Sequence, residues 1–585
     1  MKKTSIFLLL YIITVIEAFS ATINDSQIIH PESQIYDDFL ELQTTQEILV
    51  FTNNTPICVG ELKAYLRQFD YETMNDYSRS LYQRIYDYLY DQENLTTIPD
   101  FELSFHPRVN LEFYNKTNKD IPWSFNYYYK DNFITLPLNV GFDNVISFGT
   151  DIFLGKNKIV AAMPDNFFNV PINIKDITDD NYLEFYFPTF CYGSVGKNFG
   201  NWGYCLNIGR QGKSIGQTLT GSIIYNKTFE TDAYFEFDIY GSAVKYSLDI
   251  VQIGSNRIDN IQKENTDRYM YYHQMDIRPF KNFKVSIIEG SLVANSFALR
   301  FLNPLVFMHQ FGGWTNYISE ENKEIYRETN FCADFAFMFE YVPVQNLRLY
   351  GFYNQIEMQL TWERENFWGR YYPNSIGLQF GVQYSLPLAD FSRFMFGMEC
   401  FYNSPYMYMK QTPSSSLYRV RQDMQTKEQV YSWIGSPYGP DCMGGAVSIE
   451  YNSNKKWKAG LDYTFVAKGE NDFSTFDQTT YDGKYYNYYP SIEYRLKSLA
   501  EDGVVDPNYN TDITYDEIYD KTKRIWITGI GEFTNQIKLK GTYCINSSVE
   551  INGQIVYKYI VNFKHEKSVD AHGAEVSVAI TYKPF

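Results

Sequence analysis

The clearest match to a catalytic motif is Gly212-Lys213-Ser214-Ile215-Gly216, which has the G-x-S-x-G spacing of serine hydrolases. That chemistry needs a strand, a sharp elbow at the serine and a helix directly after it. Residues 218–225 instead continue with the alternation of a strand. Spacing brings no pair of acidic residues together for general acid–base work. We therefore expect a protein that is not an enzyme and that needs no cofactor.

Metal chemistry is equally unsupported by the spacing of histidines and cysteines. The six histidines form no helical metal-binding motif, and the seven cysteines contain no C-x-x-C pair and no zinc spacing. We expect no metal site. Cys191 and Cys205 flank a glycine-rich segment and could form a disulfide in an oxidising compartment, or could be independent strand and loop cysteines.

Recognition of sugars is a better-supported chemistry. Segment 359–374 combines tryptophan, tyrosine, arginine and glutamate in a stretch without strand alternation. Flat rings stack on sugar C–H faces, and guanidinium groups bond hydroxyls or acidic sugars. The candidate glycan-binding residues are Trp362, Trp368, Arg370 and Tyr371, with Trp433 in the long segment 405–440. The alternative interpretation is a self-packed outer loop or an aromatic girdle.

Strict alternation of apolar and polar residues indicates the strands that must position the candidate binding segments. From Trp457 to Val466, aromatic and aliphatic side chains alternate with polar ones. The preceding run, residues 445–451, repeats the pattern and forms a hairpin with it, and a second hairpin lies near residues 235–250. This predicts strands with one face in lipid and one in a watery lumen. We expect Trp457, Leu461, Tyr463 and Phe465 to face lipid. The expected lumen-facing residues are Glu236, Asp238, Asp249, Glu450, Lys458 and Asp462.

Length and composition agree with a membrane barrel. Aromatic residues make up 18% of the 585 residues, which suits interfacial belts. With strands of ~9–11 residues, the part of the chain from residue 101 onward suits roughly 16–22 strands. We predict an all-β membrane fold: a large antiparallel transmembrane β-barrel over residues 100–585. Segments 311–329, 359–374, 405–440 and 467–522 are expected to lie outside it.

The N-terminal region has a different character. Residues 1–20 combine two lysines, an apolar run and small residues before a cleavage position, which predicts a signal peptide. Residues 21–55 are polar and show no sustained period, so we expect an extended or partly ordered segment. Helical periodicity then follows in two runs, from Gly60 to Phe69 and from Leu81 to Tyr90. We predict that residues 21–99 form a small periplasmic cap or plug with two amphipathic helices.

Charge and the C-terminus indicate the partners. The formal net charge of −18 disfavours binding to nucleic acid. The chain stops at Phe585, and outer-membrane barrels commonly end on an aromatic residue, although Pro584 interrupts the alternation before it. We expect a location in the cell outer membrane, with outer-membrane lipid and the barrel assembly machinery as partners.

The order of several short strings resembles the capsule-assembly Wzi-type outer-membrane family. The strings are Gly60-Glu61-Leu62, Asn207-Ile208-Gly209-Arg210-Gln211, Thr220-Gly221-Ser222-Ile223-Ile224, His273-Gln274-Met275-Asp276-Ile277-Arg278-Pro279-Phe280, Leu302-Asn303-Pro304-Leu305 with His309-Gln310, and Asn403-Ser404-Pro405-Tyr406-Met407-Tyr408. They cover mainly residues 60–420, and the chain departs from the pattern beyond residue 420.

The resemblance implies a roughly 18-stranded barrel with a periplasmic helical bundle and an outer surface that binds capsular or other cell-surface polysaccharide. Arg210 falls in a matched string and becomes a further candidate for glycan contact, although a charge pair in the barrel explains it equally well. The rival hypothesis is a porin-type channel for small solutes. Its lumen would be acidic and would favour cations.

Overall fold

The computed structural model describes residues 19–584, apart from positions 22, 91, 95–99, 123, 125–131, 156–165, 170–183, 187–189, 228–231, 254–266, 295, 312–330, 366–368, 423–428, 454–455, 477–478, 482–483 and 505–507. The expected signal peptide therefore lies almost entirely outside the described residues. Among the helices that are described, none has the length and the apolar character needed to cross a membrane.

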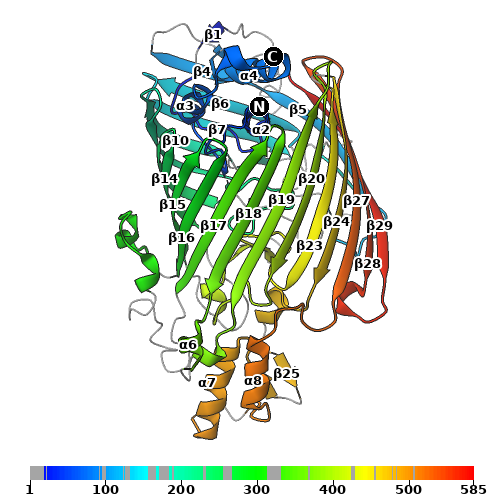
Figure 1. Ribbon diagram of the computed structural model, residues 1–585. Coiled ribbons are helices and arrows are strands. Elements are labelled where there is room, and N and C mark those ends of the chain that lie inside the picture. Colours follow the sequence, from blue (N-terminus) through cyan, green and yellow to red (C-terminus); the bar gives the residue numbers. More distant parts are fainter. Residues whose placement is uncertain are drawn as a thin grey trace, which may run out of the picture.

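The main sheet closes on itself into an 18-stranded antiparallel β-barrel, as predicted from the sequence (Figure 1). Sequential strands pair with their neighbours, and the ring closes where β7 pairs with β10 and β29 pairs with β5. Strands β4 and β5 are two parts of one barrel strand. Both pair with β6 in one continuous register, and Pro107 lies between them. Proline has no N–H to donate to the ladder, so the strand breaks there.

The barrel strands are β4 (Phe101–Phe105), β5 (Arg108–Lys116), β6 (Ile134–Phe142), β7 (Ile146–Gly155), β10 (Cys191–Asn198), β11 (Gly203–Gln211), β13 (Asp232–Tyr240), β14 (Val244–Gln252), β15 (Arg268–Phe280), β16 (Phe283–Ala294), β17 (Phe331–Val344), β18 (Leu347–Glu357), β19 (Ser375–Pro387), β20 (Arg393–Asn403), β23 (Cys442–Asn452), β24 (Trp457–Lys468), β27 (Glu532–Cys544), β28 (Val549–Val561) and β29 (Ala571–Tyr582). Short strands β8 (Asn166–Phe168) and β9 (Glu184–Tyr186) join the same sheet.

The two ends of the barrel differ in the length of their connections. At one end the turns are short, as between β15 and β16, where only Lys281 and Asn282 intervene. At the other end the connections are long, as between β20 and β23 and between β24 and β27. Outer-membrane barrels have short periplasmic turns and longer extracellular loops. The short-turn end, which is the upper end in Figure 1, is therefore the periplasmic end.

Side chains alternate between the two faces of the wall as the sequence indicates. On β24, Trp457, Leu461 and Tyr463 are exposed on the outside of the barrel. Asp462 lies on the inside, where Ser448 of β23 donates a hydrogen bond to it at 2.5 Å. An isolated barrel exposes its apolar outer face because lipid is the solvent that covers it.

The N-terminal region lies at the periplasmic end (Figure 1). It contains β1 (Phe19–Ala21), α2 (Ile35–Gln46), β2 (Asn54–Thr55), α3 (Val59–Leu66), η1 (Tyr71–Thr73), α4 (Asp76–Tyr90) and β3 (Gln92–Asn94). Its buried apolar side chains form one cluster with Phe190, Tyr192, Cys205 and Tyr240 of the barrel wall region. We call residues 23–90 the plug.

Helix α2 was not predicted, because residues 21–55 were expected to form an extended or partly ordered segment. Buried positions occur on most sides of this helix, and they include the polar Glu41 and Gln43 as well as Phe39 and Leu42. A helix buried on most sides shows no amphipathic period in its sequence. The prediction of an extended segment was therefore wrong for residues 35–46.

The remaining elements belong to the connections at the extracellular end. They are β12 (Ser214–Ile215), η3 (Leu299–Leu302), η4 (Met308–Phe311), α6 (Thr361–Glu365), η6 (Gly369–Tyr371), η7 (Pro413–Ser415), β21 (Tyr418–Gln422), β22 (Gln429–Trp433), η8 (Phe473–Phe476), β25 (Thr479–Tyr481), β26 (Lys484–Tyr486), α7 (Pro490–Glu501), α8 (Tyr515–Thr522) and η9 (Phe563–His565). Figure 1 shows α6, α7 and α8 extending beyond the barrel rim, away from the plug.

Replacing Leu461 by arginine tests the assignment of the outer face. An arginine on the lipid face near the middle of the bilayer costs about 2–4 kcal/mol of folding free energy. We expect Leu461→Arg to lower the free energy of unfolding by that amount, measured by guanidinium titration of the protein in phospholipid vesicles. Leu461→Ala is the control for the lost apolar area. Equal stability of the arginine and alanine variants would contradict the assignment.

Candidate functional site

Several charged residues on the inner wall near β13 and β14 are buried in ion pairs. Glu236 and Asp249, both expected to face the lumen, lie on the inner faces of β13 and β14. Lys213, from the connection after β11, reaches them with Nζ–carboxylate distances of 2.6 Å and 2.8 Å. All three side chains are almost fully buried. One lysine therefore serves two buried carboxylates, and each of them gains a counter-charge within the protein.

Asp238, the third acidic residue of this wall, is linked to the plug through Lys245. Lys245 of β14 lies 3.2 Å from Asp238 of β13 and 2.7 Å from Glu61 of α3. Tyr65, one turn further along α3, donates a hydrogen bond to Glu61 at 2.6 Å. Burial raises the pKa of Glu61 to about 7, and Lys245 offsets only part of that effect. Lys245 thus joins wall and plug through one buried network.

Similar contacts hold the rest of the plug. Arg393 of β20 forms an ion pair with Glu41 of α2. Lys284 and Arg278 donate hydrogen bonds to the carbonyl oxygens of Val50 and Leu49, at 2.8 Å and 2.7 Å. The plug therefore lies inside the periplasmic mouth of the barrel and is bonded to its wall on several sides.

Segment 405–440 was expected outside the barrel, and that expectation was wrong. Residues 404–419 are buried, and Arg268 of β15 donates hydrogen bonds to the carbonyls of Ser416 and Tyr418 at 3.0 Å and 2.7 Å. Arg419 pairs with Asp232 of β13 at 2.7 Å. The segment folds back into the barrel because its tyrosines and methionines join an internal apolar cluster that includes Trp433.

Trp433, a candidate glycan contact, is consequently buried. Its ring stacks on Phe473 with centroids 4.2 Å apart, and its indole N–H donates to Asp472 at 3.0 Å.

Ser214 of the G-x-S-x-G string lies in strand β12, which pairs with β2 of the plug. Residues 216–227, directly after this serine, contain no helix, so the elbow that a hydrolase requires is missing there.

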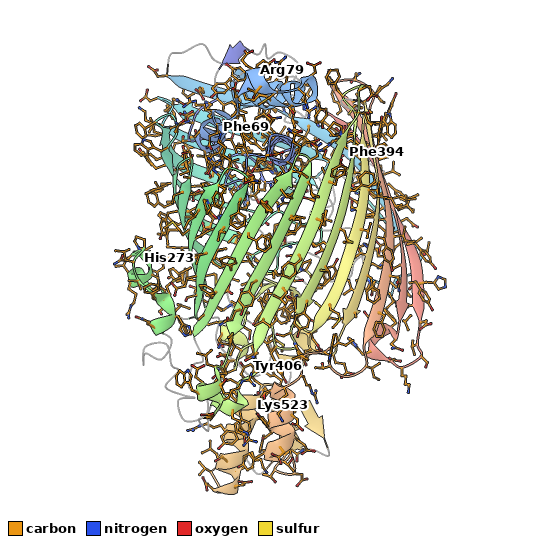
Figure 2. All side chains as sticks on the ribbon, in the orientation of Figure 1. Phe69, Arg79, His273, Phe394, Tyr406 and Lys523 are labelled. Carbon is orange, nitrogen blue, oxygen red and sulfur yellow. The ribbon has the colours of Figure 1, made fainter. Side chains whose placement is uncertain are left out.

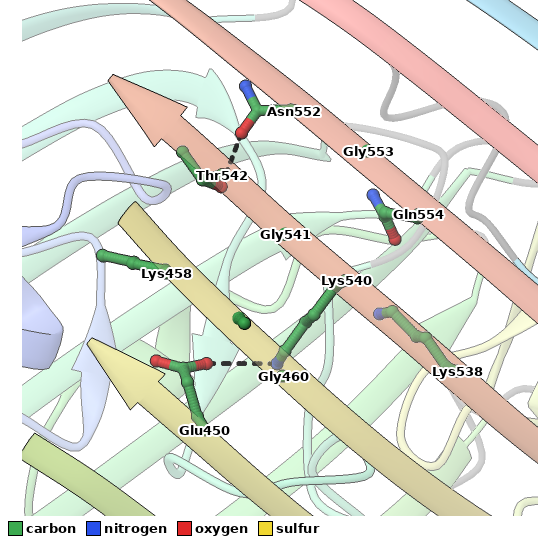
Figure 3. Close-up of a pocket in the computed structure, with 11 residues that line it drawn as sticks. Glu450, Lys458, Gly460, Lys538, Lys540, Gly541, Thr542, Asn552, Gly553 and Gln554 are labelled. Carbon is green, nitrogen blue, oxygen red and sulfur yellow. Dashed lines mark hydrogen bonds and ion pairs between the residues drawn. The ribbon is translucent and has the colours of Figure 1, made fainter. Parts of the chain in front are cut away.

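Beside the plug, the wall formed by β23, β24, β27 and β28 lines a recess of about 250 Å³ (Figure 3). It contains Glu450 and Lys458, both predicted to face the lumen, together with Lys538, Lys540 and Thr542. Lys540 lies 3.2 Å from Glu450 and 3.5 Å from Asp462. Lys458 donates to the Gln34 side chain of the plug at 2.5 Å. The recess is polar and more basic than the acidic lumen that the sequence suggested.

The predicted glycan-binding loop forms part of a small outer subdomain, residues 358–374 and 487–524. Tyr371 is buried in it and stacks on Tyr494 of α7 with centroids 4.1 Å apart. The guanidinium of Arg370 lies 4.2 Å from the ring centroid of Tyr519 on α8. Trp362, on α6, has 62% of its surface exposed. Among these candidates, Trp362 is exposed to solvent, whereas Tyr371 and Arg370 pack within the subdomain.

Trp368 falls outside the described residues. Arg210 lies on the outward face of β11, because Asn207, Gly209 and Gln211 take the inward positions. Cys191 and Cys205 face opposite sides of the wall, and neither is bridged. Each predicted glycan-binding role stays a prediction.

Sequence reasoning missed the counter-charges Lys213, Arg393, Glu41 and Glu61, and with them the link that Lys245 makes between wall and plug. Lys245 and Asp238 share one hairpin, but the other partners lie far apart along the chain. A single charged residue on a strand or helix shows no spacing that would reveal such a distant pair. Among the described residues, no cluster of three or more His, Cys, Asp or Glu side chains could hold a metal ion.

No protein-family model matches the chain, and no curated protein sequence matches it. Among solved structures, the chain is similar to Wzi, described as an outer membrane protein involved in group 1 capsule assembly in Escherichia coli and as a carbohydrate-binding β-barrel. The TM-score is 0.51 at 12% sequence identity, over 95% of this chain and 99% of that one. The fold is that of an outer-membrane β-barrel. This places the chain in the outer membrane.

Less similar are two Pseudomonas aeruginosa structures. The outer membrane protein OprD gives a TM-score of 0.36 at 8% identity, over 84% of this chain and 95% of that one. OccK3 (OpdO) gives 0.37 at 9% identity, over 82% of this chain and 95% of that one.

Removing the cation shared by wall and plug should loosen the plug. Lys245→Met leaves Glu61 and Asp238 buried without their counter-charge, and breaking a buried pair costs about 3–5 kcal/mol. We expect Cys58, which is buried in the plug, to react faster with a maleimide, measured by mass spectrometry of its peptide. Lys227→Met is the matched control, because its partner Glu32 is exposed and such a pair contributes about 0–1 kcal/mol.

The effect of Lys245→Met should grow with pH. Burial holds the pKa of Glu61 above its value in the unfolded chain, so the folded protein binds more protons than the unfolded chain between these values. The stability of the plug in this variant therefore falls as the pH rises from about 5 to about 8. Labelling rates are compared with those of Lys245→Arg at each pH. Equal rates in the two variants would contradict the role of the cation.

Proposed function

We propose that the protein binds cell-surface polysaccharide through its outer subdomain, without enzymatic chemistry. The observation that carries the proposal is the exposed ring of Trp362, on a folded platform beyond the extracellular rim of the barrel. The similarity of fold to the carbohydrate-binding barrel Wzi supports it. Carbohydrate binding on the outside needs no open pore, which agrees with a plug fixed in the periplasmic mouth.

Hydrogen bonds hold the backbone of the platform beneath Trp362. The backbone N–H of Gln359 donates to Asn374 at 3.1 Å, which closes the base of the loop. At the start of α6, the N–H of Leu360 donates to Glu363 at 2.7 Å and satisfies an otherwise unpaired helix donor. A ring held in place loses little conformational freedom when a ligand binds, so a fixed aromatic contributes more affinity than a mobile one.

Neither packing nor lipid explains the exposure of Trp362. The apolar cluster of the subdomain is built from Tyr371, Tyr494 and Ile518, and Trp362 is absent from it. Trp362 also lies on α6, beyond the rim that ends the lipid-facing wall (Figure 1). Met358 and Leu360 are exposed in the same segment, and grouped apolar surface outside the membrane is typical of a binding site. Sugar C–H faces suit the ring of Trp362.

The matched comparison is between Trp362→Ala and Trp526→Ala. Trp526 is similarly exposed, at 67%, but it lies next to the barrel wall and not on the outer subdomain. The carbonyl of the preceding residue, Ile525, accepts a hydrogen bond from Tyr402 on the outward face of β20. We expect loss of Trp362 alone to weaken retention of polysaccharide about fivefold, because one ring contact contributes about 1 kcal/mol. The measurement is total carbohydrate in washed cell pellets of strains that produce each variant.

Both variants should keep the heat-modifiable electrophoretic migration of a folded barrel. Equal carbohydrate in the Trp362→Ala and parent pellets would contradict the proposal. A similar loss in both tryptophan variants would also contradict it, because the effect would then not be specific to the outer subdomain.

The recess beside the plug favours a second candidate function, a path for small solutes. Because Lys458, Lys538 and Lys540 line it, such a path would select anions rather than the cations expected from the sequence. Under this function, Lys540→Glu would shift the reversal potential in a salt gradient towards cation selectivity. Lys564→Glu, exposed in the connection between β28 and β29, would leave it unchanged. Absence of conductance in parent and variants would exclude the solute path.

A further inference from the structure

A short segment of the chain lies against the outside of the barrel. Residues 296–310, which we call the bracket, follow β16 and include η3 and most of η4. The bracket is the green segment beside the wall at the left of Figure 1, and His273 of β15 is labelled next to it in Figure 2. Its buried side chains Phe301 and Met308 form a cluster with Ile250, Tyr271 and Val293 of the wall.

The wall residues that the bracket covers point away from the lumen. On β15, Gln274 faces inward, where it exchanges hydrogen bonds with Asn54 of the plug at 2.9 Å and 3.2 Å. Tyr271 and His273 have the opposite parity and therefore face outward. Glu289 of β16 is paired directly with His273 in the sheet and shares that face. The bracket thus lies on the surface that a barrel turns towards lipid.

Polar contacts fix the bracket to this wall. The backbone N–H of Ala298 donates to the Tyr271 hydroxyl at 2.7 Å, and His273 Nε2 lies 2.7 Å from the carbonyl oxygen of Phe301. The N–H of His309 donates to Glu289 at 3.1 Å. A histidine and a glutamate on a bare lipid face would lack partners, which is costly in hydrocarbon. The bracket supplies those partners.

Large apolar side chains dominate the exposed side of the bracket, which also carries the exposed polar residues Asn303, His309 and Gln310. Leu299, Leu305 and Phe307 have 69%, 85% and 70% of their surfaces exposed, and Phe297 is also exposed. The wall below continues this surface, because Met275, Ile277 and Phe280 are exposed on the same face of β15. The apolar outer side of the bracket is therefore continuous with the lipid-facing belt of the barrel.

The position of the bracket along the strands places it in the outer half of that belt. Strand β15 runs from Arg268 at the extracellular end to Phe280 at the periplasmic turn. With about 3.4 Å per residue and a tilt of ~40°, the stretch from Tyr271 to Phe280 spans roughly 23 Å along the membrane normal. An apolar band of a barrel is ~25 Å tall. The contacts at Tyr271 and His273 are near its extracellular edge.

We propose that the bracket is embedded in the outer leaflet and that Leu299, Leu305 and Phe307 bind the acyl chains of its lipids. The bracket gives the barrel a lipid-binding projection at β13–β17. Its polar contacts to Tyr271, His273 and Glu289 replace water and shield these groups from hydrocarbon. This inference is independent of the proposed glycan binding, because it concerns a different face of the protein.

The test is a nitroxide spin label at Leu305→Cys, in a protein whose half-buried or exposed cysteines 191, 400 and 544 are alanine. The labelled protein is reconstituted into vesicles of phosphatidylethanolamine and phosphatidylglycerol. We expect the label to be severalfold more accessible to oxygen, which dissolves in hydrocarbon, than to a water-soluble nickel chelate. Val504→Cys, exposed at 63% after α7, is the matched control and should show the opposite preference.

Preference of the Leu305 label for the nickel chelate would overturn the proposal, because the bracket would then lie in water. A label shielded from both reagents would also overturn it and would indicate a second protein chain on this face. His273→Ala in the labelled protein gives an independent measurement. Loss of the contact to Phe301 should increase the mobility of the label, and an unchanged spectrum would contradict the role of the polar contacts.

Discussion

Ion pairs between buried charges of the inner wall and charges from other parts of the chain hold the internal architecture of the barrel together. Lys245 is shared by Asp238 of the wall and Glu61 of the plug, and Arg393 of the wall pairs with Glu41 of α2. Removing one member of a buried pair costs far more than an exposed pair contributes. The wall therefore determines where the plug sits, and the plug belongs to the core of the barrel.

This arrangement divides the protein into surfaces with different tasks. The side of the lumen next to β13–β20 is filled by the plug and by the returning segment that carries Trp433, whereas β23–β28 line a polar recess. Recognition of a large polymer then falls to the extracellular end, where Trp362 projects from the outer subdomain. The outer wall meets lipid directly along most of its surface, and through the bracket at β15 and β16.

The barrel could be predicted from the sequence because alternation is a local signal. The run around Leu461 and Asp462 shows both faces of one strand within ten residues, and the structure confirms the barrel. The plug helix α2 could not be predicted, because a helix buried on most sides has no amphipathic period. Segment 405–440 looked like an outer loop because it lacks strand alternation, yet long-range contacts such as that of Arg419 with Asp232 draw it inside. Tyr371 and Trp362 are both aromatic residues of segment 359–374, and the sequence does not show which of them is buried. Only folding of the outer subdomain buries Tyr371 and leaves Trp362 exposed.

Hydrogen–deuterium exchange of the intact protein in vesicles tests most directly whether the plug is part of the barrel core. The amides of α2 and α3 are expected to exchange as slowly as those of β14 and β20, because opening the plug requires separating Glu41 from Arg393 and Glu61 from Lys245. The amides of α7 and α8, outside the barrel, should exchange faster. Exchange of α2 and α3 at the rate of α7 and α8 would show a detached periplasmic domain and would contradict the account.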